Sequence, residues 1–139
     1  MLSLVVLMAE IGSASPVGKW MNADKDAIIQ IHPCPDRPAN LCGRITTILD
    51  PSEARARDDH NPNPSLRARA VLGLEILNGF VPTATGWSNG SIYDPEEGRL
   101  YSGLNLRMDG HNRLVISKPA NLLLFNGELG RQTWTRADP

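Results

Sequence analysis

Residues 87–103, WSNGSIYDPEEGRLYSG, decide the fold, because two extended segments flank a tight connection at Asp94-Pro95-Glu96-Glu97-Gly98. Proline fixes φ at the first turn position, and glycine can adopt the left-handed conformation that closes a short hairpin. Tyr93 and Tyr101 stand on either side of this turn, and aromatic residues on paired strands commonly anchor a sheet. This stretch therefore predicts an antiparallel β-hairpin.

Turn signals recur from Val71 to the end of the chain. They are Asn78-Gly79, Asn89-Gly90, Glu97-Gly98, Asp109-Gly110 and Asn126-Gly127. Asn-Gly and Asp-Gly favour hairpin turns because both central positions need positive φ. The second dipeptide has an alternative interpretation as a bulge inside a strand from 87 to 93. Apolar segments separate the turns: Leu72, Leu74 and Ile76; Leu100, Leu104 and Leu106; Leu114 and Ile116; and residues 122–125.

The first half of the chain shows the same period of two. Ala27, Ile29 and Ile31 alternate along one segment, and Ile45, Thr47 and Leu49 along the next. We expect eight or nine short antiparallel strands and no helix of more than two turns. Sequential hairpins favour closure into an up-and-down barrel, which removes exposed sheet edges, over a sandwich, which usually needs crossovers.

Length and charge limit the classes of function. The 139 residues are enough for one domain with a single core. The chain has 14 basic and 15 acidic residues, a net charge of −1. Nucleic-acid binding and a polybasic membrane patch both require a basic excess, so we expect neither.

The first 15 residues are predicted to be a signal peptide or its remnant. Residues 2–9 are apolar, and Ser13-Ala14-Ser15 offers small residues for cleavage, although no basic residue precedes the apolar run. The run is shorter than the roughly 20 residues that span a bilayer, so an integral membrane protein is not expected. The prediction is a periplasmic or secreted protein, with an apolar N-terminal strand or helix as the alternative.

Cys34 and Cys42 are the two cysteines of the chain. The seven residues between them are rich in turn formers, and two strand ends joined by such a loop can approach to disulfide distance. An exported protein favours a disulfide here, whereas a cytoplasmic one would keep two buried thiols. A zinc site needs more ligands, and only His32 is near in sequence.

Residues 50–69, DPSEARARDDHNPNPSLRAR, form a long polar segment with three prolines and no apolar periodicity. A loop of this length inside a compact domain is often functional. Residues 52–57 include helix formers, so a helical turn at Pro51–Arg57 is the alternative to an irregular loop there. Asp59, Asn61 and Asn63 have the spacing that opens an EF-hand loop, but Pro64 and Ala70 replace its required glycine and glutamate. No metal site is predicted, and Arg67 and Arg69 are expected to pair with Asp58 and Asp59.

Catalytic and cofactor-binding residues are not predicted. The chain has three histidines, His32, His60 and His111, and no serine in a nucleophile-elbow context. A metal-assisted hydrolase built on Asp58, Asp59 and His60 stays as an alternative.

The two ends of the predicted barrel carry complementary residues. Gly18 and Trp20 lie near its start, and Trp134 and Arg136 near its end. First and last strands are neighbours in a closed barrel, so a guanidinium can stack on an indole there. Such a pair would close one end structurally and leave the opposite end as the open mouth.

These motifs resemble the lipocalin and wider calycin signature and, more specifically, the bacterial family called domain of unknown function 2147. The resemblance covers residues 17–136 and implies an exported lipocalin-like barrel without an established activity. The matching pieces are Gly18-x-Trp20, Cys34, Leu41-Cys42-Gly43-Arg44-Ile45, Asp59-x-Asn61-Pro62, Leu66-Arg67-x-Arg69, Leu72-Gly73-Leu74, Trp87-x-x-Gly90-x-Ile92-Tyr93-Asp94-Pro95, Gly98-x-x-Tyr101 and Trp134-x-Arg136.

The leading prediction is a barrel that binds a small apolar or amphipathic molecule, because eight strands leave room for one small ligand or for a filled interior. The expected lining residues are Ile29, Leu74, Trp87, Tyr93, Tyr101, Leu104 and Leu106. Asp59, Asn61, Arg67 and Arg69 are expected at a rim or lid. A second hypothesis is an interaction module, in which a filled barrel docks on an envelope or secreted protein partner.

Overall fold

The protein is an all-β barrel in a computed structural model that describes residues 15–118, 123–124 and 128–138. Eight strands form the barrel in the order β1-β10-β7-β6-β5-β4-β3-β2. Their bounds are β1 Gly18–Met21, β2 Ala27–Pro33, β3 Leu41–Ile48, β4 Glu75–Thr83, β5 Gly86–Asp94, β6 Arg99–Asp109, β7 Arg113–Ser117 and β10 Arg131–Arg136. A separate two-stranded sheet joins β8 (Leu123–Leu124) to β9 (Glu128–Leu129).

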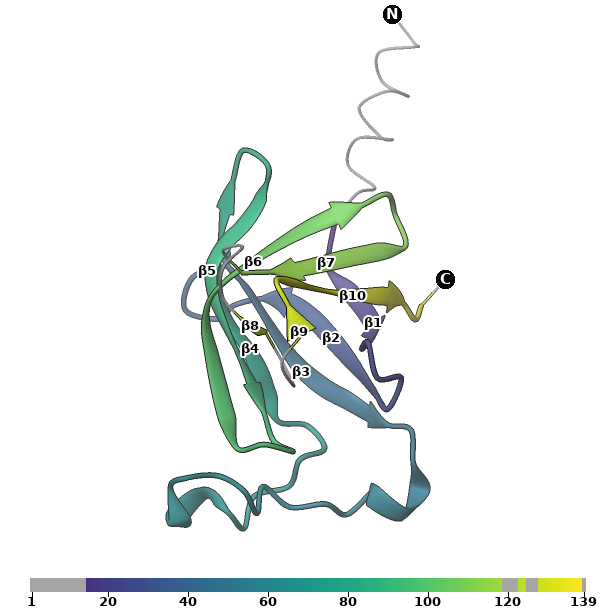
Figure 1. Cartoon of the computed structure of the whole chain (residues 1–139), viewed down its shortest axis with the longest axis vertical. Coiled ribbons are helices and arrows are strands. Elements are labelled where there is room, and N and C mark those ends of the chain that lie inside the picture. The colour runs from purple at the N-terminus through teal and green to yellow at the C-terminus, as the bar shows by residue number, and fades with distance from the viewer. Residues whose placement is uncertain (1–14, 119–122, 125–127, 139) are drawn as a thin grey trace, which may run out of the picture.

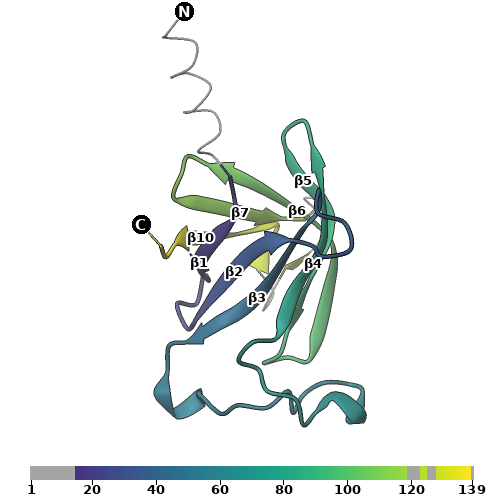
Figure 2. The same ribbon diagram turned by 180° about the vertical axis from the view of Figure 1, so that it is seen from behind.

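Every neighbouring pair of barrel strands is antiparallel, and the sheet closes where β1 pairs with both β2 and β10. Trp20 opposes Ile29 on one side and Arg136 on the other. Figures 1 and 2 show the closed wall from two sides, with the long connection between β3 and β4 at one end. The predicted up-and-down barrel is confirmed.

Two turn signals lie inside strands: the predicted turn at Asn78-Gly79 is wrong, and the alternative interpretation of Asn89-Gly90 as a bulge is confirmed. Asn78-Gly79 belongs to β4 and Asn89-Gly90 to β5. Gly79 and Asn89 have φ of 71° and 57°. The register shifts beside Gly79 in the β3–β4 pairing, between Leu41–Phe80 and Gly43–Leu77, and beside Asn89 in the β5–β6 pairing, between Trp87–Leu106 and Gly90–Leu104. Positive φ at these positions serves bulges that bend long strands around the barrel. The chain turns instead at residues 84–85, between β4 and β5.

Two other predicted turns are confirmed, and the remaining one lies outside the described residues. Turns at Glu97-Gly98 and after Asp109 join β5 to β6 and β6 to β7, as predicted. Asn126-Gly127 and the predicted signal peptide lie outside the described residues, apart from Ser15, and the predicted strand at 122–125 is described only at β8.

The prediction that β4 includes Leu72 and Leu74 is wrong, because the strand begins at Glu75. Gly73 has a φ of 88°, and a turn hydrogen bond joins the Leu74 N–H to the Val71 carbonyl, so the chain is still turning there. Leu72 is 45% exposed. The connection from β3 to β4 therefore runs over residues 49–74, and it contains two 3₁₀ turns, η1 (Pro51–Glu53) and η2 (Pro64–Leu66).

Large side chains fill one half of the barrel. The most deeply buried hydrophobic side chains of the barrel are Ile29, which lies in the other half, and Trp20, Ile31, Leu77, Phe80, Leu104, Leu106, Leu114 and Ile116. Phe80 packs over the backbone of Gly90, where an added Cβ would lie 2.3 Å from the ring. The filled half carries the hydrophobic stability of the domain.

The filled half ends in the predicted stack of Arg136 on Trp20, with the guanidinium carbon 4.3 Å from the ring centroid. The Trp20 indole N–H donates to the carbonyl of Pro16 at 2.8 Å, and Arg136 donates to the carbonyls of Ser15 and His111. The stacked and hydrogen-bonded guanidinium covers the barrel interior between β1 and β10 at this end. We call it the closed end.

A disulfide joins Cys34 to Cys42 at the closed end, as predicted. We expect the double substitution Cys34→Ser/Cys42→Ser to lower the free energy of unfolding by about 2–3 kcal/mol. The disulfide closes a loop between cysteines eight positions apart, and without it the unfolded chain gains conformational entropy. Chemical denaturation of oxidised wild type and variant measures the difference. Full reduction of the wild type should reproduce the variant, and equal midpoints for oxidised wild type and variant would contradict the expectation.

Candidate ligand cavity

A cavity of about 630 Å³ opens at the end of the barrel opposite the Arg136–Trp20 stack. Three connections surround it: residues 22–26 between β1 and β2, the 49–74 segment, and residues 95–98 between β5 and β6. In an up-and-down barrel alternate connections lie at the same end, so these three meet there. We call this end the mouth.

The wall of the cavity is apolar. It consists of Ala27, Ile29, Ile45, Ile48, Val71, Ile76, Ile92 and Trp134. Most of these residues occupy inward positions near the mouth ends of their strands, where the period of two directs them into the barrel. They are mostly shorter than the aromatic side chains of the filled half, so the barrel stays open here. The volume lies within the roughly 300–1,000 Å³ typical of small-molecule sites.

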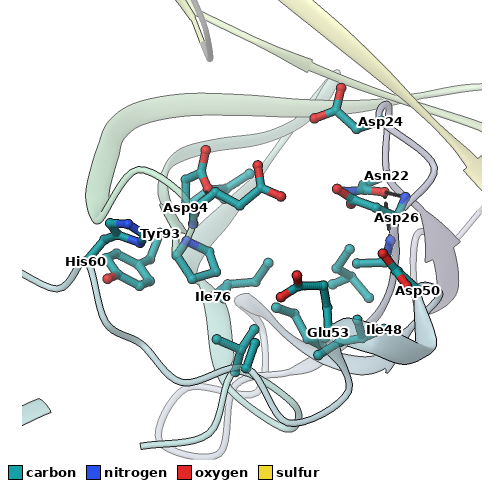
Figure 3. Close-up of a pocket in the computed structure, with 18 of the residues that line it drawn as sticks. Asn22, Asp24, Asp26, Ile48, Asp50, Glu53, His60, Ile76, Tyr93 and Asp94 are labelled. Atoms are coloured by element: carbon teal, nitrogen blue, oxygen red, sulfur yellow. Dashed lines mark hydrogen bonds between the residues drawn. The ribbon is translucent and has the colours of Figure 1, made fainter. Parts of the chain in front are cut away.

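The rim of the cavity is acidic. Its carboxylates are Asp24, Asp26, Asp50, Glu53, Asp59, Asp94 and Glu96, and its basic residues are Arg57 and His60. Figure 3 shows the side chains of Asp24, Glu53 and Asp94 around one opening, together with Ile48 and Ile76. We call these seven carboxylates the acidic rim.

Two carboxyl groups on the turn between β5 and β6 have altered acidity. Burial and the neighbouring Glu97 carboxyl raise the pKa of Asp94 to about 6. Partial burial raises the pKa of Glu96, and the negative charges of Asp26 and Asp24 raise it further. The carboxylates of facing connections are therefore close enough to repel one another across the mouth.

The 49–74 connection is fixed to the barrel through Asp58, whose side chain has no solvent exposure. It accepts hydrogen bonds from the Tyr93 hydroxyl at 2.6 Å, the Asn61 amide at 2.9 Å and the Arg69 guanidinium at 2.9 Å. Burial alone would raise the pKa of Asp58, but these three donors together hold it below its ordinary value. Burial and the Asp58 carboxylate raise the pKa of Tyr93 to about 12, so its hydroxyl stays a donor.

The arginines of the connection serve its internal structure. Arg69 pairs with Asp58, as expected, whereas Arg67 donates to the Asn61 carbonyl rather than pairing with Asp59. Arg57 donates to the Ala68 carbonyl at 2.9 Å. These contacts explain why the rim is acidic although the connection itself contains as many as four arginines, counting Arg55.

The predicted site residues fall into three places. Ile29, Tyr93 and Asp59 lie on the cavity. Leu104 and Leu106 lie in the filled core, Tyr101 is buried and donates to Glu97, and Leu74 and Trp87 are half-buried against the core. Asn61, Arg67 and Arg69 hold the 49–74 connection together behind the rim.

Sequence reasoning did not find most of the acidic rim. Asp94 caps its own turn by accepting a hydrogen bond from the Glu96 N–H at 2.9 Å, and it also lines the cavity. The available signal was that Asp24, Asp50 and Glu96 occupy alternate connections of a meander, which must share one end of a barrel.

Two further findings concern metal and membrane. No group of three or more His, Cys, Asp or Glu side chains in the described part of the chain is arranged to hold a metal ion. No helix among the described residues is long and apolar enough to cross a membrane. Asp58, which the hydrolase alternative would use, does not line the cavity, and both of its oxygens accept hydrogen bonds.

A closed eight-stranded antiparallel barrel with one filled end and one open end defines a lipocalin-like protein. A solved structure described as "Protein HP1028 from the human pathogen Helicobacter pylori belongs to the lipocalin family" shares this fold with a TM-score of 0.72. The two are 18% identical, and the match covers 90% of this chain and 84% of the other. No curated protein sequence matches the chain.

The chain belongs to the family described as "Uncharacterized protein conserved in bacteria (DUF2147)", whose model matches residues 18–136.

Proposed function

We propose that this protein is an exported binding protein that holds a small apolar or amphipathic molecule in the mouth half of its barrel. The observation that carries the proposal is the cavity of about 630 Å³ with an apolar wall of strand residues and a polar rim. Ligand sites in proteins commonly combine an apolar lining with a few polar groups that orient the ligand. The lipocalin-like architecture is compatible with this use.

The cavity favours a binder over a filled docking module. A docking module needs a packed interior and presents a continuous exposed apolar patch. Here Ile45, Ile76 and Ile92 belong to the buried core and at the same time line a cavity of about 630 Å³. A structural role alone gives no reason for isoleucines to face a void, since unfilled volume costs stability.

The proposed compartment is the periplasm or the extracellular space. The disulfide between Cys34 and Cys42 supports it, because such bonds persist in oxidising compartments. Expression with the natural N-terminus in a bacterial host, followed by fractionation and intact-mass measurement, tests the proposal. A periplasmic product that has lost about 15 residues and two cysteine protons is expected, and a full-length cytoplasmic product would contradict export.

Filling the cavity should abolish binding. We expect Ala27→Trp to weaken binding of N-phenyl-1-naphthylamine, an uncharged apolar dye, at least tenfold, because the indole would occupy space beside Ile48. Fluorescence titration measures the dissociation constant.

The matched control is Ala84→Trp, which makes the same change at an exposed turn between β4 and β5. It should bind the dye like the wild type, and both variants should keep the circular dichroism of a folded barrel. Equal affinity in both variants, or no saturable binding by the wild type, would contradict the proposed function. Native mass spectrometry of the exported protein then shows whether a molecule copurifies.

A further inference from the structure

No carboxylate of the acidic rim forms an ion pair within the described part of the chain. The ion pairs of the described residues join His32 to Glu75, Arg69 to Asp58, Arg113 to Asp109 and Arg136 to Asp138. None of them includes a rim carboxylate. A ring of carboxylates above an apolar wall therefore has negative charge that a bound molecule could neutralise.

The rim carboxylates come from three separate connections. Asp24 and Asp26 lie between β1 and β2, Asp50 and Glu53 at the start of the 49–74 connection, and Asp94 and Glu96 between β5 and β6. Their meeting is therefore a property of the mouth and not of one acidic stretch of sequence. The turns at the closed end line no part of this cavity.

We propose that the cavity selects amphiphiles whose polar end is a cationic amine, with the ammonium group among the rim carboxylates and the hydrocarbon chain along the isoleucine wall. This inference rests on the proposed binding function. An ammonium group at the rim would be partly desolvated and would face several carboxylates at short range, where charge interactions are stronger than in bulk water. A carboxylate or sulfate head would meet like charge at the same place.

The pKa values of two rim carboxyl groups support the preference for a cationic amine. Burial raises the pKa values of both Asp94 and Glu96; the Glu97 carboxyl adds to the shift of Asp94, and Asp26 and Asp24 add to that of Glu96, so a cation at the rim would favour the ionised forms. Ligand binding should therefore favour their ionised forms, and affinity for an amine should fall as the pH is lowered through about 6. His60 and Arg57 also line the cavity beside these carboxylates.

Isothermal titration with decylamine, decanol and decanoate at about pH 7.5 tests the proposal with one chain length and three head charges. We expect decylamine to bind at least tenfold more tightly than decanoate, with decanol between them. Added salt should weaken the decylamine interaction and leave that of decanol unchanged, because salt screens charge only.

Two double variants locate the effect. Asp94→Asn/Glu96→Gln removes two rim charges, and Asn at 94 can still cap the turn, so we expect a loss of at least fivefold in decylamine affinity with decanol unaffected. Asp36→Asn/Asp109→Asn removes the same charge at the closed end and should leave decylamine affinity within a factor of two. This pair separates a local rim from the net charge of the molecule.

The outcomes are distinguishable. Decanoate binding as tightly as decylamine, or equal losses in both double variants, would overturn the amine proposal while the binding function stands. Failure of all three compounds and of the naphthylamine dye to bind would overturn the binding function itself.

Discussion

Gly90→Ala is expected to destabilise the barrel by about 3 kcal/mol or more, although it adds a single methyl group. The new Cβ would lie 2.3 Å from the ring of Phe80, and that ring is fully buried. Overpacking a dense core usually costs about 1–3 kcal/mol, and here the obstructing atoms are the first carbons of a ring with no room to rotate away. Urea denaturation followed by circular dichroism measures the loss.

Gly79→Ala is the matched comparison for this change. Its added Cβ would meet no atom within 4 Å, but φ is 71°, so its cost should be the conformational one of roughly 1 kcal/mol. Combining Gly90→Ala with Phe80→Leu should reduce the cost of the alanine, because the smaller side chain leaves room for it. An alanine that costs the same in both backgrounds would show that Phe80 is not the cause.

Asp58→Ala is expected to lower the free energy of unfolding by about 3 kcal/mol. The change leaves the Tyr93 hydroxyl, the Asn61 amide and the Arg69 guanidinium without the acceptor that now binds all three. Breaking a buried pair costs about 3–5 kcal/mol, and Arg69 is 38% exposed and so regains part of its hydration. Denaturation gives the global effect, and hydrogen exchange over residues 57–70 shows whether the 49–74 connection opens first.

The neighbouring substitution Asp59→Ala is the control, because Asp59 is exposed at the rim and should change stability by less than about 0.5 kcal/mol. Asp58→Asn adds a test of charge. The folded-state pKa of Asp58 is lowered, so its ionised form contributes stability above the unfolded pKa, and that contribution is lost as the pH falls through the folded value. The difference in free energy of unfolding between wild type and Asp58→Asn should be constant near neutrality and shrink below about pH 4. A difference that grows on acidification would contradict this assignment.

The architecture was predictable because it depends on local patterns. Residues 87–103 carry both a turn and its flanking strands, and β5 and β6 pair as that hairpin requires, with Tyr93 opposite Leu100. The spacing of the cysteines and the stack of Arg136 on Trp20 also follow from which strand ends must be neighbours. Asn78-Gly79 misled because the same dipeptide serves a hairpin turn and a strand bulge, and only the barrel's curvature distinguishes them.

The site was less predictable because it depends on which side chains fill the barrel and which stop short. Leu104 and Ile45 look alike in sequence and both are buried in the core, yet only Ile45 also lines the cavity. The difference is set by height along the barrel, which follows from register and not from alternation. The charge of the 49–74 connection was also misleading. Its basic residues, including Arg57, Arg67 and Arg69, balance its acidic ones in composition, so the sequence of this connection does not indicate an acidic rim.

The pairing of β1 with β10 also bears on how this barrel could be re-engineered. The Ala137 N–H donates to the Lys19 carbonyl at 2.8 Å, so the first and last strands leave the barrel side by side at the closed end. A short linker could join them, and new termini could be opened at residues 84–85, in the turn between β4 and β5. Such a circular permutant would keep the three connections that line the cavity covalently intact, which makes it a suitable scaffold for attaching a reporter without disturbing ligand entry.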